Sequence, residues 1–332
     1  MPSTLVHYTF ALKHLHEDFG YREAILLGAQ GPDPWEMYGQ LPWCHRKDAK
    51  TVRRMGRDTQ LSPCEGNYRG FIEYALRSDD RDLLFAYIDG LLMHYCLDRA
   101  CHPYVFWNTG FTDRPEDSPS VRQYYNFGHL FFERTLDLII SQREGTYGRP
   151  NIALRCPKAD VKAISSMWYH VNQNHQKNPC ISPVSYEKAL KDYRSINRVL
   201  HSPKGVIKKI AKTVFGRYSY PYAFPMPHSL KAYGFEGIDF LNETHATWHM
   251  PSGEARTESF DDLMNLAGLL YEKMHRELAK IRNGVGSYES LERLFDGITH
   301  EGVTPESPKL YWRLIWPASF QVDVIDHPEP EK

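Results

Sequence analysis

The chain has 332 residues and a formal net charge of −1, and 42% of its residues are hydrophobic. This apolar share excludes an intrinsically disordered chain and predicts a folded protein with a large buried core. The near-neutral charge provides no overall field that would attract a nucleic acid or a membrane, so no specific nucleic-acid partner is indicated.

Apolar residues recur at helical spacing along most of the chain, and convincing strands of alternating polarity are absent. We therefore expect an all-α fold with many helices, in a single domain that covers residues 1–332. A domain boundary near residue 150 is the alternative. The expected helices cover residues 4–18, 21–28, 66–77, 81–102, 121–143, 159–175, 184–200, 204–215, 259–282 and 287–297.

Two long segments between these helices, residues 29–65 and 216–258, are rich in proline, glycine and aromatic residues and are expected to be irregular. Loops of that length are often functional. Pro103 is expected to end the helix over residues 81–102. The last residues, 326–332, are expected to fray.

Several features concern the cellular compartment. The first residues show no basic segment followed by an apolar run, so no signal peptide is expected, and no stretch of about 18 apolar residues predicts a membrane-spanning helix. The 6 cysteines include no CxxC pair, which favours free thiols. These features predict a cytoplasmic protein.

Metal-type ligands stand four residues apart in two of the expected helices. The first helix carries His94, Asp98 and His102, and the second carries His129 and Glu133. A spacing of four places side chains on one helix face, one turn apart. Five such ligands on two helices predict a site for more than one metal ion. The alternative is a pair of helices with ordinary buried hydrogen bonds between histidine and carboxylate.

Upstream, Asp33 lies between two prolines in Gly-Ala-Gln-Gly-Pro-Asp-Pro-Trp, which begins at Gly28. Glycines permit unusual φ angles and prolines restrict the approach of the carboxylate. A carboxylate held in this way can bind a metal or act as a base, and the alternative is a surface turn. His7 and His45 are weak candidates when taken singly, and Asp137 is expected to be solvated.

Together these motifs resemble the zinc-dependent phospholipase C family. Its members share an all-helical fold with secreted phosphocholine-releasing phospholipases and single-strand nucleases. The resemblance rests on Asp33, on His45, on His-x3-Asp-x3-His-Pro at 94–103 and on His-x3-Glu at 129–133. A further match over residues 248–263, Trp-His-Met-Pro-Ser-Gly-Glu followed by Glu-Ser-Phe-Asp-Asp-Leu, is similar to intracellular bacterial members.

The resemblance implies up to three zinc positions in a ligand core over residues 1–145, with residues 146–332 supplying the remaining helices and loops. The implied ligands are, ion by ion, Asp33, His45, His94 and Asp98; His102, His129 and Glu133; and His7 with Asp98 as a bridge. Secreted members complete the third position with an N-terminal tryptophan, whereas this chain begins Met-Pro-Ser-Thr. Two ions and three ions therefore both remain open.

The implied activity is hydrolysis of a phosphoester, most simply a phosphodiester, in which zinc-generated hydroxide attacks phosphorus. Asp33 would bind a metal, orient the nucleophile or take its proton, and the sequence does not separate these roles. A nuclease or nucleotidase on the same fold is one alternative. A non-catalytic metal-binding protein is another.

The expected substrate is a phospholipid headgroup or a nucleotide. Aromatic faces can hold a choline-like cation or a nucleobase, and the alternative is that such rings belong to the core. The rings near the ligands in sequence are Trp35, Trp43, Tyr104, Phe106 and Trp107. A short basic amphipathic segment over residues 204–212 favours peripheral contact with a membrane, unless it is merely a solvated face.

Overall fold

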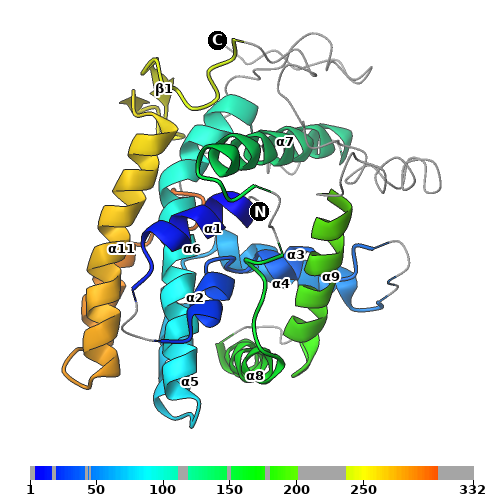
Figure 1. Ribbon diagram of the computed structural model, residues 1–332, viewed down its shortest axis with the longest axis vertical. Helices are drawn as coiled ribbons and strands as arrows, with labels where there is room; N and C mark the ends of the chain where they lie inside the picture. The colour runs from blue at the N-terminus through cyan, green and yellow to red at the C-terminus, as the bar shows by residue number, and fades with distance from the viewer. Residues whose placement is uncertain are drawn as a thin grey trace.

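The computed structural model describes residues 4–16, 20–41, 44, 46–110, 119–147, 151–175, 180–200 and 237–305. Within these ranges the chain is predominantly helical, which confirms the expected class, with one short hairpin added (Figure 1). The elements are α1 (Thr4–Lys13), α2 (Arg22–Gly28), α3 (Asp33–Glu36), α4 (Ala49–Leu61), α5 (Glu65–Leu76), α6 (Arg81–Thr109), α7 (Pro119–Arg143), α8 (Lys158–His175), α9 (Ser185–Leu200), β1 (Trp248–His249), β2 (Ala255–Arg256), α11 (Phe260–Arg282) and α12 (Tyr288–Phe295).

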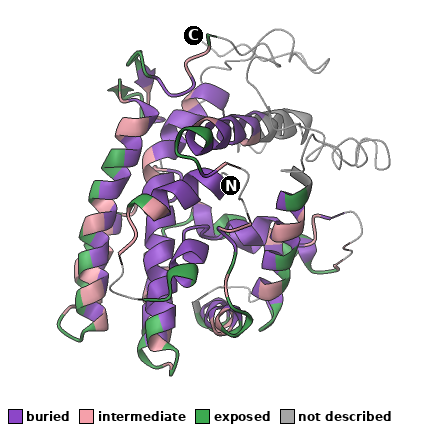
Figure 2. Ribbon diagram, in the orientation of Figure 1, coloured by how far each residue is buried: buried purple, intermediate pink, exposed green. Residues whose placement is uncertain are grey.

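Helix α6 is the centre of the fold. It is buried on all sides along most of its length, as expected for a helix that other helices surround (Figure 2). Helix α11 runs beside it, α2 crosses it, and α1, α5, α7 and α8 also contact it (Figure 1). The ligand motif of α6 therefore lies in the interior.

Two glycines allow α2 to approach α6 very closely. A Cβ atom at Gly28 would lie 2.2 Å from the carbonyl oxygen of Tyr87, and one at Gly90 would lie 2.1 Å from that of Ile25. No other residue fits either position without moving a backbone. This contact brings the loop that follows α2, including Asp33, against the histidine of the next turn of α6, His94.

The prediction that Pro103 ends α6 is wrong. The helix continues to Thr109, with Pro103 inside it, and ends at Gly110, whose φ of 69° permits the turn. Proline removes one helical hydrogen bond. The helix persists because Tyr104, Val105 and Phe106, which follow the proline, are all buried.

The prediction that residues 29–65 are irregular is also wrong in part, because they contain α3 and α4. Helix α4 buries Val52, Met55 and Thr59 along one face while its charged residues face outward. The many charged residues of α4 made this buried stripe hard to recognise in the sequence. In the segment 216–258, the described part contains the hairpin, in which β1 pairs antiparallel with β2. The helix expected over 204–215 and the C-terminal tail lie outside the described residues.

A buried polar cluster fixes α11 on α6. Asp89 of α6 is 0% exposed and accepts a hydrogen bond at each carboxylate oxygen, from the Tyr271 hydroxyl at 2.8 Å and from Nδ1 of His275 at 2.8 Å. Ser259 and Asp262 cap the start of α11 reciprocally. The six cysteines are free thiols. Across the described ranges, no helix combines the length and apolar character that crossing a membrane requires.

Candidate metal centre

The structure brings seven of the eight sequence-predicted ligands into one buried region between α1, α3, α6 and α7. Six of them come from helices that meet at the middle of α6, and Asp33 begins the short helix α3. His45 lies outside the described residues. Six of the seven form two groups of three, in which one donor atom per residue lies within 4.8 Å of the others, and either group could hold a metal ion.

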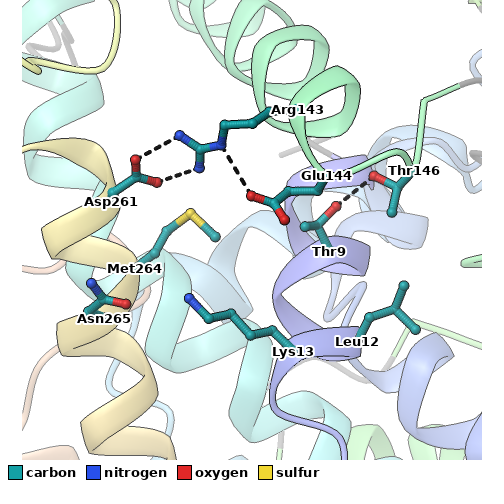
Figure 3. Close-up of a pocket in the computed structure, with 9 residues that line it drawn as sticks. All are labelled: Thr9, Leu12, Lys13, Arg143, Glu144, Thr146, Asp261, Met264 and Asn265. Atoms are coloured by element: carbon teal, nitrogen blue, oxygen red, sulfur yellow. Dashed lines mark hydrogen bonds and ion pairs between the residues drawn. The ribbon is translucent and has the colours of Figure 1, made fainter.

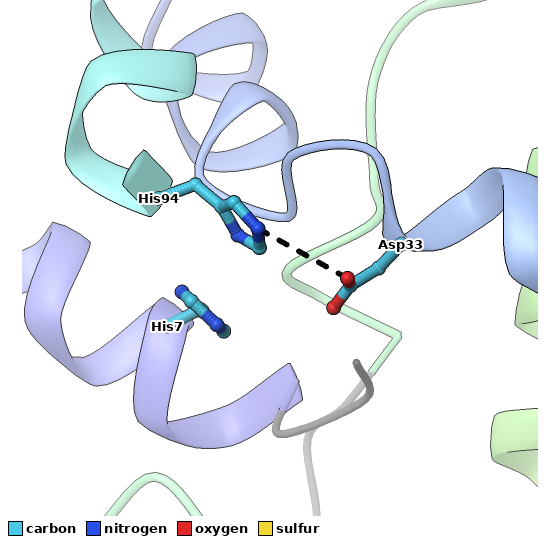
Figure 4. A group of neighbouring side chains, drawn as sticks. All are labelled: His7, Asp33 and His94. Atoms are coloured by element: carbon cyan, nitrogen blue, oxygen red, sulfur yellow. Dashed lines mark ion pairs between the residues drawn. The ribbon is translucent and has the colours of Figure 1, made fainter. Parts of the chain in front are cut away.

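The first group consists of His7, Asp33 and His94, all of them buried (Figure 4). The rings of His7 and His94 stack with centroids 4.2 Å apart, and Nε2 of His94 lies 4.0 Å from Oδ1 of Asp33. The resemblance implied that His7 joins Asp98 at a third position. His7 stands beside Asp33 and His94, and its Nε2 also lies 3.2 Å from Oδ1 of Asp98, so the geometry does not separate the two groupings.

Gly31 makes room for this group. Its φ is +54°, and a Cβ atom there would lie 2.2 Å from the His94 ring. The glycine-rich sequence before Asp33 thus permits a tight turn directly over the imidazole, as its composition suggested. The carbonyl of Ala29, in the same turn, accepts a hydrogen bond from Nδ1 of His94 at 3.2 Å.

The second group consists of His102, His129 and Glu133, the grouping that the resemblance implied. Oε1 of Glu133 lies 3.1 Å from Nε2 of His129, one turn earlier on α7, and 3.4 Å from Nε2 of His102 on α6. The ring of Phe106 covers the group, with centroids 5.5 Å from His102 and 5.2 Å from His129.

Asp98 lies between the two groups. Its Oδ2 is 2.9 Å from Nε2 of His94, and its Oδ1 is 3.2 Å from Nε2 of His7 and 3.8 Å from Nε2 of His102. One carboxylate therefore faces imidazoles of both groups. A bridging role for Asp98 is what the resemblance implied.

Two of the imidazoles use their Nδ1–H in hydrogen bonds to the backbone. Nδ1 of His94 donates to the Ala29 carbonyl, and Nδ1 of His102 donates to the His300 carbonyl at 2.6 Å. A neutral imidazole bound in this way presents the lone pair of Nε2 on its other side. Among the described residues, neither Nε2 of His94 nor Oδ2 of Asp98 has a hydrogen-bond partner, although they lie 2.9 Å apart.

Two buried acceptors at this distance repel each other unless a proton or a metal cation lies between them. Zinc binds imidazole nitrogen and carboxylate oxygen at ~2.0–2.2 Å, so two ligand atoms at ordinary coordination angles stand ~2.9–3.5 Å apart. The separations around Asp98 and Glu133 fall in or near this range. The donor set and its geometry therefore fit divalent ions.

The pKa values reflect the excess of carboxylate charge. Burial lowers the pKa of His102, but the carboxylates of Asp98 and Glu133 outweigh it and raise that pKa to about 9. Burial alone would raise the pKa of Asp98, yet His94 and His102 hold it well below its usual value. Burial and the adjacent His94 ring lower the pKa of His7. A proton on His102 therefore supplies positive charge between the carboxylates of Asp98 and Glu133.

A small cavity borders both groups. It has a volume of about 20 Å³ and is lined on its polar side by His7, Asp98, His102 and Glu133. About 10–15 Å³ of such volume suffices for one water molecule, so the cavity accommodates a single ion or water. His7 and Asp98, the two residues that the resemblance assigns to a third ion, both line it.

Three residues that sequence reasoning missed, or misjudged, support the ligands. Gln60 donates from Nε2 to Oδ1 of Asp33 at 3.1 Å, and the carbonyl of His300 holds His102. Asp137, expected to be solvated, is buried, and its Oδ1 accepts the N–H groups of Leu5 and Val6. It ties the start of α1 to α7. The four-residue spacing after Glu133 was the available signal.

The aromatic candidates divide between core and site. Trp35 is fully buried against Trp168 and Tyr186, and Tyr104 is buried with its hydroxyl bonded to the Phe240 carbonyl, so both belong to the core. Phe106 covers the second ligand group. Trp107 contacts His249 at the hairpin. Trp43 lies outside the described residues.

A larger pocket, of about 480 Å³, lies elsewhere, between α1, the end of α7 and the start of α11 (Figure 3). Arg143 forms a two-pronged ion pair with Asp261 on its wall. None of the metal-type ligands lines this pocket. It is separate from the metal centre.

Comparisons with known proteins leave the metal centre as the main guide to function. No family model matches the chain, and no curated protein or solved structure matches it either.

Proposed function

We propose that the protein is a zinc-dependent phosphoester hydrolase of the phospholipase C type, built on the corresponding phospholipase C and single-strand nuclease fold. Support comes from the agreement of two independent lines. The sequence motifs resemble the ligand pattern of that family, and six of those ligands, from four separate segments, stand in two buried groups that could hold metal ions, with Asp98 between the groups.

One observation carries the metal part of the proposal. Nε2 of His94 and Oδ2 of Asp98 face each other at 2.9 Å without a hydrogen bond in the described part of the chain, while Nδ1 of His94 is held by the Ala29 carbonyl. The protein thus fixes the imidazole with its lone pair directed at a carboxylate. This arrangement is typical of a metal ligand with an orienting outer partner.

When bound, divalent ions would polarise a phosphoryl oxygen and lower the pKa of a coordinated water. The chain's own residues would fix the geometry. Asp98 would join the two groups, and Asp33, with Oδ1 held by Gln60, would present its carboxylate to the first ion. Phe106 would exclude water from one side of the second group.

The proposed substrate is a phosphodiester, either a phospholipid headgroup or a nucleotide. The resemblance favours the phospholipid. Asp33 is proposed as the residue that also orients the attacking water, since its buried carboxylate belongs to the first group.

The size of the cavity favours a second candidate, a metal-binding protein without hydrolytic activity. Within the described residues, the cavity that borders the ligands measures about 20 Å³, which admits an ion and not a phosphodiester. The seven ligands are also all buried. Activity therefore separates the two candidates.

The experiment uses the full chain, stripped with a chelator and reloaded with zinc or, as a control, with magnesium. Each preparation is incubated with phosphatidylcholine vesicles, bis(4-nitrophenyl) phosphate and single-stranded DNA. Zinc-dependent hydrolysis of a phosphodiester supports the proposal, and preference for DNA over the lipid identifies the nuclease alternative. Full zinc occupancy without hydrolysis of any of the three substrates contradicts it in favour of the non-catalytic candidate.

A further inference from the structure

We propose that Gln60 and the loop over residues 298–303 position one ligand in each metal group and fix the two groups relative to each other. These residues are together called the brace. This inference rests on the proposed metal centre and concerns residues that are not ligands themselves. The brace joins α4, in the first part of the chain, to a loop near its end.

A continuous chain of hydrogen bonds forms the brace. Nδ1 of His102 donates to the carbonyl of His300 at 2.6 Å, the backbone N–H of His300 donates to the carbonyl of Gln60 at 3.3 Å, and Nε2 of Gln60 donates to Oδ1 of Asp33 at 3.1 Å. All four residues are buried. The path therefore runs from a ligand of the second group to a ligand of the first.

The loop is fixed on α6 from two sides. The Tyr95 hydroxyl donates to the carbonyl of Ile298 at 3.0 Å. Thr299 closes a turn: its backbone N–H and its hydroxyl donate to the Val303 carbonyl, and its own carbonyl accepts from the N–H of Gly302. Gly302, with a φ of +72°, packs against α6 so closely that a Cβ atom would lie 2.3 Å from the Arg99 carbonyl. The position of the His300 carbonyl is thereby set by α6 itself.

The His300 side chain completes the wall of the site without adding charge. Its ring lies 5.6 Å from that of His94 and packs edge-on against Tyr95. Burial and the neighbouring His94 lower the pKa of His300 to about 3, so the imidazole is neutral. The brace acts on the ligands through the His300 backbone and the Gln60 amide.

Outer partners of this kind matter because they select the tautomer of a ligand histidine and the orientation of a ligand carboxylate. Their loss weakens metal binding by about 10- to 100-fold in known metal sites. The His300 carbonyl selects the Nδ1–H tautomer of His102, which leaves Nε2 for the ion. The Gln60 amide, through its hydrogen bond to Oδ1, fixes the orientation of the Asp33 carboxylate.

The test compares two pairs of variants by competition for zinc with a chromophoric chelator, which resolves successive binding steps. Gln60→Met removes the amide at nearly constant length, and Gln40→Met is its matched control, since the Gln40 amide donates to the Glu36 carbonyl within the same turn. Gly302→Ala displaces the loop. Gly297→Ala is its control, with a similar φ of +65° and no atom near the added Cβ.

We expect Gln60→Met to weaken one zinc-binding step and Gly302→Ala to weaken the other, each by about 10- to 100-fold. The controls should bind zinc like the wild type. In the metal-free protein, Gly302→Ala should also abolish the slow solvent exchange of the His102 Nδ1 proton, seen by nitrogen-15 NMR, while Gly297→Ala preserves it.

Unchanged zinc affinity in Gln60→Met and Gly302→Ala, in a wild type that binds two ions, overturns the brace and leaves the proposed function standing. If a variant and its control lose the same zinc affinity, the loss reflects general destabilisation, and the brace proposal is also overturned. A wild type that binds no zinc overturns both proposals.

Discussion

Helix α6 carries two buried carboxylates, Asp89 and Asp98. Both lie beside histidine, but they differ in the number of hydrogen-bond donors that face the carboxylate. Asp89 has one donor for each oxygen, a tyrosine hydroxyl and a histidine Nδ1. Asp98 faces three imidazoles. Two of them, those of His94 and His102, use their Nδ1–H in hydrogen bonds to backbone carbonyls. The first cluster is complete as it stands, whereas the second requires a cation or additional protons.

This difference separates a structural histidine–carboxylate cluster from a metal site better than residue type does. Both clusters are buried, and both contain histidine and aspartate. A count of donors against acceptors predicts that Asp89 stabilises the α6–α11 contact and that Asp98 binds metal. The predictions below alter one cluster at a time.

The largest effect is expected from Asp98→Asn. The amide removes the bridging charge between the two metal groups, so zinc content should fall and any zinc-dependent hydrolysis should drop by about a thousandfold or more. Elemental analysis and the phosphodiester assay measure the two effects. Asp89→Asn is the matched control, and its zinc content should equal that of the wild type. Zinc-dependent turnover that survives Asp98→Asn would refute this site.

Removal of metal should destabilise the wild type considerably. Zinc at 100 to 1,000 times its dissociation constant stabilises the folded state by about 3–4 kcal/mol, which corresponds to several degrees in Tm. Scanning calorimetry with zinc and with a chelator measures the shift. Asp89→Asn should keep the full shift and Asp98→Asn should lose most of it. The reverse pattern would contradict the donor count.

Asp89→Asn should instead lower the stability of the protein with and without zinc. One of its two donors loses a charged acceptor in a fully buried site, which costs about 1–3 kcal/mol. Urea denaturation measures the free energy of unfolding. If Asp89→Asn proves as stable as the wild type, the Asp89 cluster does not anchor α11.

A smaller effect concerns pH. In the metal-free protein the pKa of His102 is raised to about 9, so the stability it contributes is complete below its ordinary value of 6.5 and is lost as pH rises from 6.5 to 9. The loss should be on the order of 2 kcal/mol. Urea denaturation in chelator at pH 6.5 and pH 9 measures it, with zinc-loaded protein and His102→Gln as controls. Stability that rises over this interval in chelator contradicts the raised pKa.

Much of the helical fold could be predicted from sequence, because apolar periodicity marks α1, α2, α5, α6 and α11. Prediction from apolar periodicity failed where tertiary packing overrides a local signal. Pro103 is tolerated because the residues after it are buried, and α4 was hidden by its charge. The ligand types and spacing on α6 and α7 identified the candidate site, since a helix converts spacing directly into a shared face.

What sequence did not provide are the contacts between distant segments. Nothing in the spacing relates Gln60 or His300 to the ligands, because Gln60 reaches Asp33 from α4 and His300 reaches His102 from a loop 198 residues later in the sequence. The placement of His7 beside Asp33 and His94 likewise depends on how α1 packs, with Asp137 holding its first turn.

The most direct test of the metal centre is a crystal structure of the zinc-loaded protein with anomalous data collected on both sides of the zinc absorption edge. The account predicts one peak among His7, Asp33 and His94 and a second among His102, His129 and Glu133, with Asp98 between them. A protein with these side chains in place and no anomalous peak at either group would contradict it.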